Sequence, residues 1–344
     1  MRSFASALSL ALGLLMFAGC GAGIVAQTPS SSQAPAVSVI PDWMHVAMRA
    51  IPPQPIVYGA ATPKTGVYAA QFWGTDVLGY HTPNKNNGAP LCHVAANYVN
   101  GIGVDGTGNL VVPNGYPVQI NVYKGPSLCG KLAGSFSDPY GQASDASTQD
   151  ALNGTIVIAN IEVSHSNPKG NGAVCTLAKG CFRELKNKKI TYEVGGVALA
   201  KDGDCWLVSE NNASFTGAKL TYFHKCTGYG ATASGWKNGN WGGLVIDKAG
   251  NLVSIDFTPQ KPALWVYHGC NPRCKLVGGP FALEGDSFYG SLSKNGTELA
   301  LGDSQFGQVD VYGYTPTKLT YAYSFNNGLS LSEDVEAAAI SPSI

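Results

Sequence analysis

Six polar residues end matching apolar runs along the sequence, and their side chains could hold a cation. They are Gln71, Asn114, Asn160, Glu210, Asp256 and Asp303. Carboxylate and amide oxygens are the ligands that hard cations prefer. Asn114, Asn160, Glu210, Asp256 and Asp303 are therefore candidate metal ligands, with Ca²⁺ as the candidate cofactor. The alternative is that each residue caps its own strand by accepting hydrogen bonds from the adjacent turn.

Aromatic residues stand just before several apolar runs and form a second candidate site. They are Tyr98, Tyr140, Tyr192, Trp241 and Tyr289. An aromatic rim suits a sugar or another flat polar ligand. Packing between neighbouring sheets is the structural alternative. Glu193, Asp334 and Glu336 lie near the aromatic residues in register and could act as acid and base.

The histidines and the remaining sequence motifs predict no further metal, cofactor or catalytic site. His81, His224 and His268 each follow an aromatic residue in separate segments, and we expect them in solvated turns rather than around one metal. The segment GIGVDG at 101–106 matches GxGxxG but does not open a helix, which argues against dinucleotide binding. Neither a GxSxG nor a GxxxxGK[ST] sequence occurs.

Cysteine usage indicates an exported protein. Nine cysteines are present, and Cys20 stands apart at the end of the N-terminal apolar run. The other eight form an even set, which in an exported chain predicts disulfides. Spacing favours three pairs and leaves a fourth, although eight cysteines allow many connectivities. The pairs are Cys270 with Cys274, Cys175 with Cys181, Cys205 with Cys226, and Cys92 with Cys129. Zinc is the alternative, but no CxxC pair occurs.

The N-terminal segment has the pattern of a secretory signal over 1–20, with Arg2 before an apolar run from Phe4 to Phe17. The sequence Phe17-Ala18-Gly19-Cys20 resembles the bacterial lipoprotein box, with Phe where Leu is usual. This resemblance implies lipidation at Cys20, and Gly21 implies retention in the outer membrane. We therefore expect an outer-membrane or cell-surface lipoprotein. Residues 21–58 are expected to be a flexible tether in which only 43–50 allows a short helix.

A repeat positions all of these residues. The phrase GIGVDGTGNLVVPN at 101–114 returns as GLVIDKAGNLVSID at 243–256 and, more loosely, in four other places. The turn glycines of the six units are Gly66, Gly108, Gly154, Gly203, Gly250 and Gly296, which lie 42 to 49 residues apart. Each unit contains apolar runs on both sides of the turn, then a third run with an aromatic end. A repeat of this length with four strands per unit predicts the blades of a β-propeller.

The predicted fold is all-β: a six-bladed β-propeller of four-stranded blades over 59–344. The first unit lacks an inner strand, and the C-terminal run at 336–342 matches the missing strand. We therefore expect the C-terminal strand to pair with the first blade and close the ring. Closure would remove the exposed sheet edges that invite aggregation.

Composition excludes several classes of protein. The 344 residues carry 22 Lys and Arg against 22 Asp and Glu, and only 13% of the residues are charged. Such a chain has no net basic field to hold a phosphate backbone, so we expect no nucleic-acid partner. Hydrophobic residues make up 44% of the chain, which is too many for a wholly disordered protein.

The repeat pattern G-h-x-h-D-x-x-G-N-L, where h is apolar, resembles that of the NHL and YVTN propeller families over about 280 residues. The resemblance implies the fold and leaves the activity open. We expect a monomeric, non-catalytic module that binds an envelope protein or glycan and contacts the membrane through its lipid anchor only. The alternative is a metal-dependent hydrolase or lyase, similar to gluconolactonase-like and virginiamycin-lyase-like propellers.

Overall fold

The structure, a computed structural model, describes residues 64–344 except 116–117, 165–166, 215–216 and 259–260. The expected signal peptide over 1–20, Cys20 and the tether over 21–58 lie outside the described residues. The expectations for these segments therefore remain predictions. None of the helices within the described part of the chain is long and apolar enough to cross a bilayer.

The described residues form an all-β structure with two short 3₁₀ helices, η1 (His224–Cys226) and η2 (Leu331–Glu333). Four sheets each contain four consecutive antiparallel strands. Their strands are β4 (Gly103–Val104), β5 (Leu110–Asn114), β6 (Gln119–Tyr123) and β7 (Leu132–Phe136); β8 (Gln142–Thr148), β9 (Ile156–Glu162), β10 (Asn171–Thr176) and β11 (Gly180–Leu185); β12 (Val194–Leu199), β13 (Cys205–Glu210), β14 (Ala218–Phe223) and β15 (Ala231–Thr232); and β16 (Leu244–Ile246), β17 (Leu252–Asp256), β18 (Ala263–His268) and β19 (Lys275–Ala282).

The fifth sheet has eight strands and joins the two ends of the described chain. One half contains β20 (Ser287–Leu292), β21 (Glu298–Asp303), β22 (Gln308–Thr315) and β23 (Lys318–Phe325), and the other contains β24 (Val335–Ser341), β1 (Gly66–Gln71), β2 (Asp76–His81) and β3 (Cys92–Ala95). A single parallel pair, Tyr289 with Ala337, joins the halves. The sheets therefore number five rather than the six expected, because this contact merges two groups of four strands.

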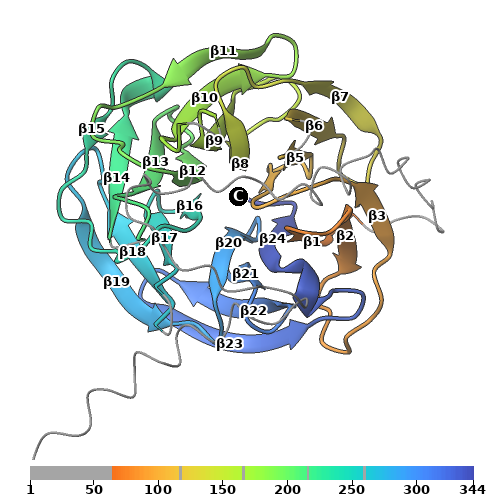
Figure 1. Ribbon diagram of the computed structural model, residues 1–344. Helices are drawn as coiled ribbons and strands as arrows, with labels where there is room; N and C mark the ends of the chain where they lie inside the picture. Colours follow the sequence, from red (N-terminus) through yellow and green to blue (C-terminus); the bar gives the residue numbers. More distant parts are fainter. Residues whose placement is uncertain (1–63, 116–117, 165–166, 215–216, 259–260) are drawn as a thin grey trace, which may run out of the picture. The chain divides into compact units, whose positions relative to one another are not determined.

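The C-terminal strand lies where its sequence predicted. β24 pairs antiparallel with β1, and the partners include Ser341 with Gly66 and Ala338 with Ala69. All seven residues of β24 are buried. The sheets surround a common centre (Figure 1), and their first strands contact one another in the order β24, β4, β8, β12, β16, β20 and again β24.

The hydrophobic core lies mainly between neighbouring sheets. One cluster contains Val157 and Val174 of the β8–β11 sheet together with Val197 and Leu207 of the next sheet. Another joins Val253 of the β16–β19 sheet to Leu301 of the β20–β23 group. Each sheet packs both of its faces against neighbouring sheets. This arrangement explains why each unit carries apolar residues on both faces of its strands.

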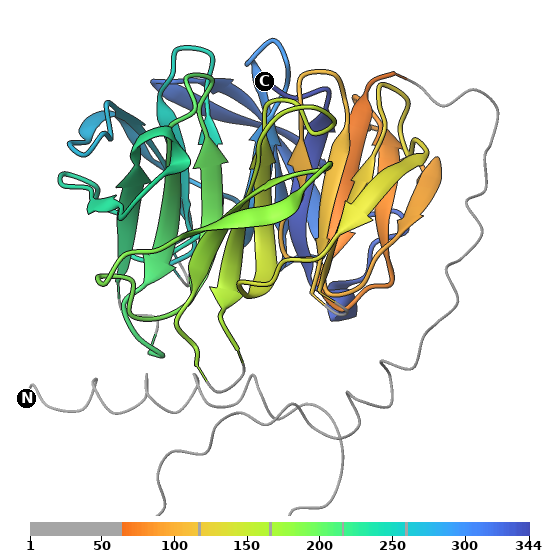
Figure 2. The ribbon, with the colours of Figure 1, turned by 90° about the horizontal axis from the view of Figure 1, so that it is seen from above.

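Strand direction defines two ends of the sheets (Figure 2). The glycine-turn end carries the turns between first and second strands, including Gly203, Gly250 and Gly296. The backbone φ angles of these three glycines are +92°, +78° and +73°, a region that favours glycine. The polar end is the opposite one, where five second strands finish at Gln71, Asn114, Glu210, Asp256 and Asp303, and β9 passes through Asn160 before it ends at Glu162.

Four disulfides are present, which confirms the prediction of disulfide bonding. They join Cys92 to Cys129, Cys175 to Cys181, Cys205 to Cys226, and Cys270 to Cys274. The first connects β3 to the loop between β6 and β7, and so ties two neighbouring sheets together. The disulfides indicate an oxidising, extracytoplasmic location.

Candidate functional site

The polar residues at the ends of the second strands mostly bond to nearby loops. Asn114 Oδ1 accepts a hydrogen bond from the Asn97 backbone N–H at 3.0 Å, and its Nδ2 donates to the Gln119 carbonyl at 3.0 Å. The Asp256 carboxylate accepts from the backbone N–H groups of Gly239 at 2.8 Å and Asn240 at 2.9 Å. These contacts match the capping interpretation of the register.

Asp303 and Gln71 follow the same rule, whereas Asn160 donates to two side chains and its Oδ1 has no hydrogen-bond partner among the described residues. Asp303 Oδ1 accepts from the Gln305 N–H at 3.0 Å, and Gln71 Oε1 accepts from the Ser330 N–H at 2.7 Å. Asn160 Nδ2 donates to Asn171 Oδ1 at 2.8 Å and to Asp138 Oδ2 at 3.1 Å. Each of these side chains therefore bonds to groups close to it at the polar end.

The carboxylates among the expected cation ligands do not come together among the described residues, and the proposed ligand set stays a prediction. Among the described residues, one group of three acidic, histidine or cysteine side chains brings its ligand atoms together: Asp138, Cys175 and Cys181. Cys175 and Cys181 form a disulfide, so they are not thiolate ligands. The carboxylates of Glu210, Asp256 and Asp303 do not form such a group.

Buried acidic groups lie near the start of β12. Glu210 is fully buried, its Oε1 accepts a hydrogen bond from the Trp241 N–H at 2.9 Å, and its Oε2 has no partner among the described residues. Burial raises the pKa of Glu210 to about 7, and the nearby Glu193 carboxylate adds to this shift. Burial likewise raises the pKa of the half-buried Glu193 to about 7, helped by Glu162.

A second group of buried titratable side chains belongs to the first strands themselves. Tyr289 of β20 donates its hydroxyl hydrogen bond to the Gly195 carbonyl of β12 at 3.0 Å. Burial raises the Tyr289 pKa well above its usual value, and Glu336 and Asp145 raise it further. Burial also raises the pKa of Asp145 to about 8, although backbone N–H groups of Val197 and Ala146 oppose the shift.

The space between the first strands is narrow. A cavity of about 60 Å³ is lined by Gly103, Asp145, Val245, Tyr289 and other residues of these strands. This volume suits a few water molecules at roughly 10–15 Å³ each rather than a drug-sized ligand. A substrate could therefore reach Asp145 through this cavity only if the surrounding strands moved apart.

The predicted aromatic rim is only partly at the surface. Trp241 and Tyr289 are 6% and 2% exposed, and the Trp241 ring packs so closely on Gly195 that a Cβ there would lie 1.9 Å from the ring. These two residues pack between sheets, which was the structural alternative. Tyr98, Tyr140 and Tyr192 are half-buried and remain candidates for ligand contact.

Tyr98 belongs to an aromatic cluster at the polar end. Its ring centroid lies 5.7 Å from Trp73 and 5.8 Å from Phe72, which both follow β1. Trp73 is 42% exposed. The sequence prediction missed Phe72 and Trp73 because neither occupies the repeated position before an inner strand; their signal was the Phe-Trp pair in a tight turn.

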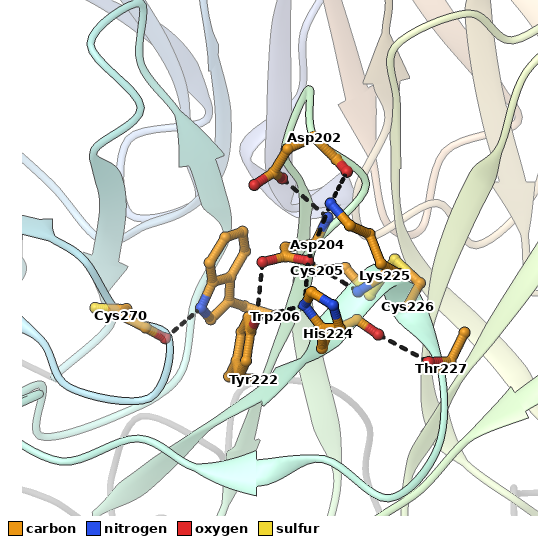
Figure 3. Close-up of polar contacts among 10 residues, drawn as sticks. All are labelled: Asp202, Asp204, Cys205, Trp206, Tyr222, His224, Lys225, Cys226, Thr227 and Cys270. Carbon is orange, nitrogen blue, oxygen red and sulfur yellow. Dashed lines mark hydrogen bonds and ion pairs between the residues drawn. A yellow bond between two sulfur atoms is a disulfide. The ribbon is translucent and has the colours of Figure 1, made fainter.

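A larger hollow lies at the glycine-turn end, between the β12–β13 and β16–β17 turns. Its volume is about 690 Å³, within the usual range for ligand sites. Trp206 and Leu252 contribute apolar surface, and Lys201 and Lys248 stand at its edges. We call this hollow the lysine groove. Figure 3 shows Trp206 held by a hydrogen bond of 2.7 Å from its Nε1 to the Cys270 carbonyl.

Both carboxylate oxygens of Asp204, beside the lysine groove, accept hydrogen bonds. Its Oδ2 accepts a hydrogen bond from the Tyr222 hydroxyl at 2.7 Å, and its Oδ1 accepts from the Lys225 N–H at 2.8 Å (Figure 3). His224 Nδ1 lies 3.2 Å from Asp204 Oδ1. These neighbours keep the Asp204 pKa below its ordinary value even though burial opposes the shift.

The three histidines stand at the ends of elements: His81 ends β2, His268 ends β18 and His224 begins η1. His81, His224 and His268 are exposed, and His268 Nδ1 lies 3.1 Å from Asn251 Oδ1. The three are not part of any group of possible metal ligands within the described residues.

Comparison with known proteins supports the fold. No family model and no curated protein sequence matches the chain. A structure titled as a nidogen/laminin complex matches with a TM-score of 0.56 and 15% identity, over 81% of this chain and 100% of that one. Hydrazine synthase of Kuenenia stuttgartiensis matches with a TM-score of 0.51 and 10% identity, over 80% and 89%. A streptogramin B lyase reaches 0.46 with 11% identity, over 75% and 73%.

The two structures with TM-scores above 0.5 are β-propeller proteins, so the chain has a propeller fold. Identities this low show the fold alone. Propellers include both binding proteins and enzymes, and the activity must be argued from the site.

Proposed function

We propose that this protein is a lipid-anchored, extracytoplasmic β-propeller of six blades that binds an envelope protein or glycan without catalysing a reaction. The six groups of four strands and the pairing of β24 with β1 support a closed ring of six blades. The NHL-like repeat pattern supports the same architecture.

The aromatic cluster of Phe72, Trp73 and Tyr98 carries the binding proposal. Two edge-on ring contacts hold Trp73, one to Phe72 at 4.6 Å and one to Tyr98 at 5.7 Å, so its exposed surface is fixed in place. A rigid, amphipathic aromatic surface gives contact area at low entropic cost, which suits sugar rings and protein side chains alike.

The alternative of a metal-dependent hydrolase or lyase is less well supported. The described residues do not gather Glu210, Asp256 and Asp303 around one point. Asp145, whose pKa burial raises to about 8 and which could act as an acid or base, lines a cavity of only about 60 Å³.

Substitution of Trp73 tests the binding proposal. We expect Trp73→Ala to weaken binding to an array of bacterial envelope glycans, or photo-crosslinking to an envelope protein in cells, by roughly tenfold or more, as for a central interface aromatic. Tyr321→Ala is the matched control, because Tyr321 is 43% exposed on β23. Equal binding by both variants and the wild-type chain would contradict the proposal.

Lipid anchoring is tested at Cys20, which follows the lipoprotein-like sequence Phe17-Ala18-Gly19. We expect metabolic labelling with an alkyne fatty acid to modify the wild-type chain and the Gln27→Ala control. The Cys20→Ala chain should lose the label because the thiol that carries the lipid is absent. Undiminished labelling of Cys20→Ala, or no labelling of the wild type, would refute the anchor.

A further inference from the structure

Three consecutive first-to-second-strand turns at the glycine-turn end present a lysine at the same position. The turns are closed by backbone hydrogen bonds from Gly203 to Ala200 at 2.9 Å, Gly250 to Asp247 at 2.9 Å, and Gly296 to Ser293 at 2.7 Å. Lys201, Lys248 and Lys294 each stand second in their turn and are exposed. The second residue of such a turn lies outside the ladder of the sheet, so its side chain is free to extend beyond the end of the strands.

Many other basic residues share this end. They stand in, or directly beside, the turns that join first to second and third to fourth strands, and all are exposed. With the three turn lysines, the set is Lys64, Lys85, Lys124, Lys131, Lys179, Lys201, Lys225, Lys248, Arg273, Lys275, Lys294 and Lys318.

One carboxylate at this end, Asp204, pairs with Lys225 at 3.8 Å, and the others leave the charge of the three turn lysines uncancelled. Asp105, Asp204 and Asp247 are buried and accept hydrogen bonds from their own turns or neighbouring residues. Asp150 is half-buried and accepts two backbone N–H groups of its own turn. Asp202 is the exposed acidic side chain among these turns.

Two further acidic groups lie close by, the half-buried Glu298 and the carboxylate of the C-terminal residue Ile344. The exposed cations outnumber all three of these acids. The side chains of Lys201 and Lys248 have no acidic partner in the described part of the chain. Lys294 Nζ donates to the Gly106 carbonyl at 2.8 Å.

The segment outside the described residues joins the propeller at this same end. Lys64 is the first residue described, and it precedes Gly66, which pairs with Ser341 at the glycine-turn end. In Figure 2 the beginning of β1 and the C-terminus lie toward the same end of the strands. A membrane tether within 1–63 would therefore leave from the basic end.

We infer that the glycine-turn end docks on an anionic phospholipid surface, with Lys201, Lys248 and Lys294 facing the lipid headgroups. Lysines at a negatively charged membrane surface contribute about 1 kcal/mol each. The lysine groove lies between Lys201 and Lys248 and offers apolar surface beside them. The net charge of the chain is zero, but exposed basic residues gather at the glycine-turn end.

Docking adds a second membrane contact to the proposed lipid anchor and directs the aromatic cluster at the polar end away from the membrane. The inference uses the anchor only for the direction of the tether. Its test reports the orientation of the chain at the lipid surface, whether or not Cys20 is acylated, so failure of docking is distinguishable from failure of the anchor.

The test measures how fast each lysine of the full chain reacts with an amine reagent on phosphatidylcholine vesicles with and without phosphatidylglycerol. With phosphatidylglycerol we expect Lys201, Lys248 and Lys294 to react on the order of tenfold more slowly. Lys188 and Lys189, in the loop after β11 at the polar end, should keep their rates. Salt at about 0.5 M should abolish the protection because it screens charges.

Two variants of equal net charge complete the experiment. Lys201→Glu/Lys248→Glu should lose protection of Lys294, whereas Lys188→Glu/Lys189→Glu should retain it. Equal rates on both vesicle types, protection of the polar end instead, or failure to associate with the anionic vesicles would overturn the inference. Protection by an anionic polysaccharide but not by phosphatidylglycerol would also overturn it.

Discussion

At the scale of single residues, the centre of the molecule concentrates acidic groups that lack a cationic partner. Glu210 Oε2 and Glu336 Oε2 are buried, and neither has a hydrogen-bond partner in the part of the chain that the structure describes. Burial raises the pKa of Glu336 well above its usual value, and Asp334 adds to the shift. A buried carboxyl without a positive neighbour is more stable in its neutral form, so these groups make the fold sensitive to pH.

The raised pKa of Glu210 determines whether the stability of the fold rises or falls with pH. Its pKa is about 7 in the folded chain and about 4.5 without burial, so the folded state binds the proton more tightly. The stabilisation is complete below the unfolded pKa and is lost as pH rises through about 7. We expect the free energy of unfolding to fall by roughly 2–3 kcal/mol between pH 4.5 and 7 for this group.

Urea unfolding across this pH range measures the effect. Glu210→Gln should flatten the pH dependence because it cannot ionise, whereas Glu284→Gln, an exposed carboxylate at the polar end, should preserve it. Identical slopes for Glu210→Gln and the wild-type chain would show that Glu210 is already ionised at low pH.

At the scale of strands and turns, local signals in the sequence predicted the most. Five of the six glycine turns, at Gly108, Gly154, Gly203, Gly250 and Gly296, became hairpins, whereas Gly66 begins β1 and pairs with β24. The third runs with aromatic ends became β2, β6, β14, β18 and β22. The pairing of β24 with β1 followed from the absence of an inner strand in the first unit. These features were predictable because strand alternation and turn chemistry depend on neighbouring residues.

The candidate site was less predictable because it depends on contacts between sheets. Trp241 and Tyr98 share a position in the repeat, yet Trp241 is buried over Gly195 and Tyr98 joins Trp73 near the surface. The difference lies in the neighbouring sheet, where a glycine leaves room for the Trp241 ring. The register alone also could not show whether the polar strand ends converge on an ion or cap their own loops.

At the scale of the whole molecule, the two ends of the sheets have different chemistry. The polar end carries the buried Glu210 and the aromatic cluster, and the glycine-turn end carries exposed lysines around buried aspartates. The same repeat produces both, since its second strand finishes in a polar residue and three of its turns carry lysine. A propeller can therefore bind a partner at one end while the other faces a different surface.

The β24 strand makes the stability of the whole molecule depend on its C-terminus. All seven of its residues are buried between β1 and β20. Deletion of 335–344 should expose the edge of β1, remove cooperative unfolding and promote association through the unpaired strand. Calorimetry and light scattering on the truncated chain measure both effects.

A point substitution separates the role of the strand from the effects of truncation. Ala338 is 1% exposed and packs in the cluster that joins β1 and β2 to the β20–β23 group. Ala338→Glu should lower the free energy of unfolding by about 4 kcal/mol or more, because a charge would enter a closed apolar space. Ser332→Glu, at an exposed position of η2, should change it by less than about 0.5 kcal/mol. If Ala338→Glu and the truncated chain unfold like the wild type, β24 does not hold the first and last sheet groups together.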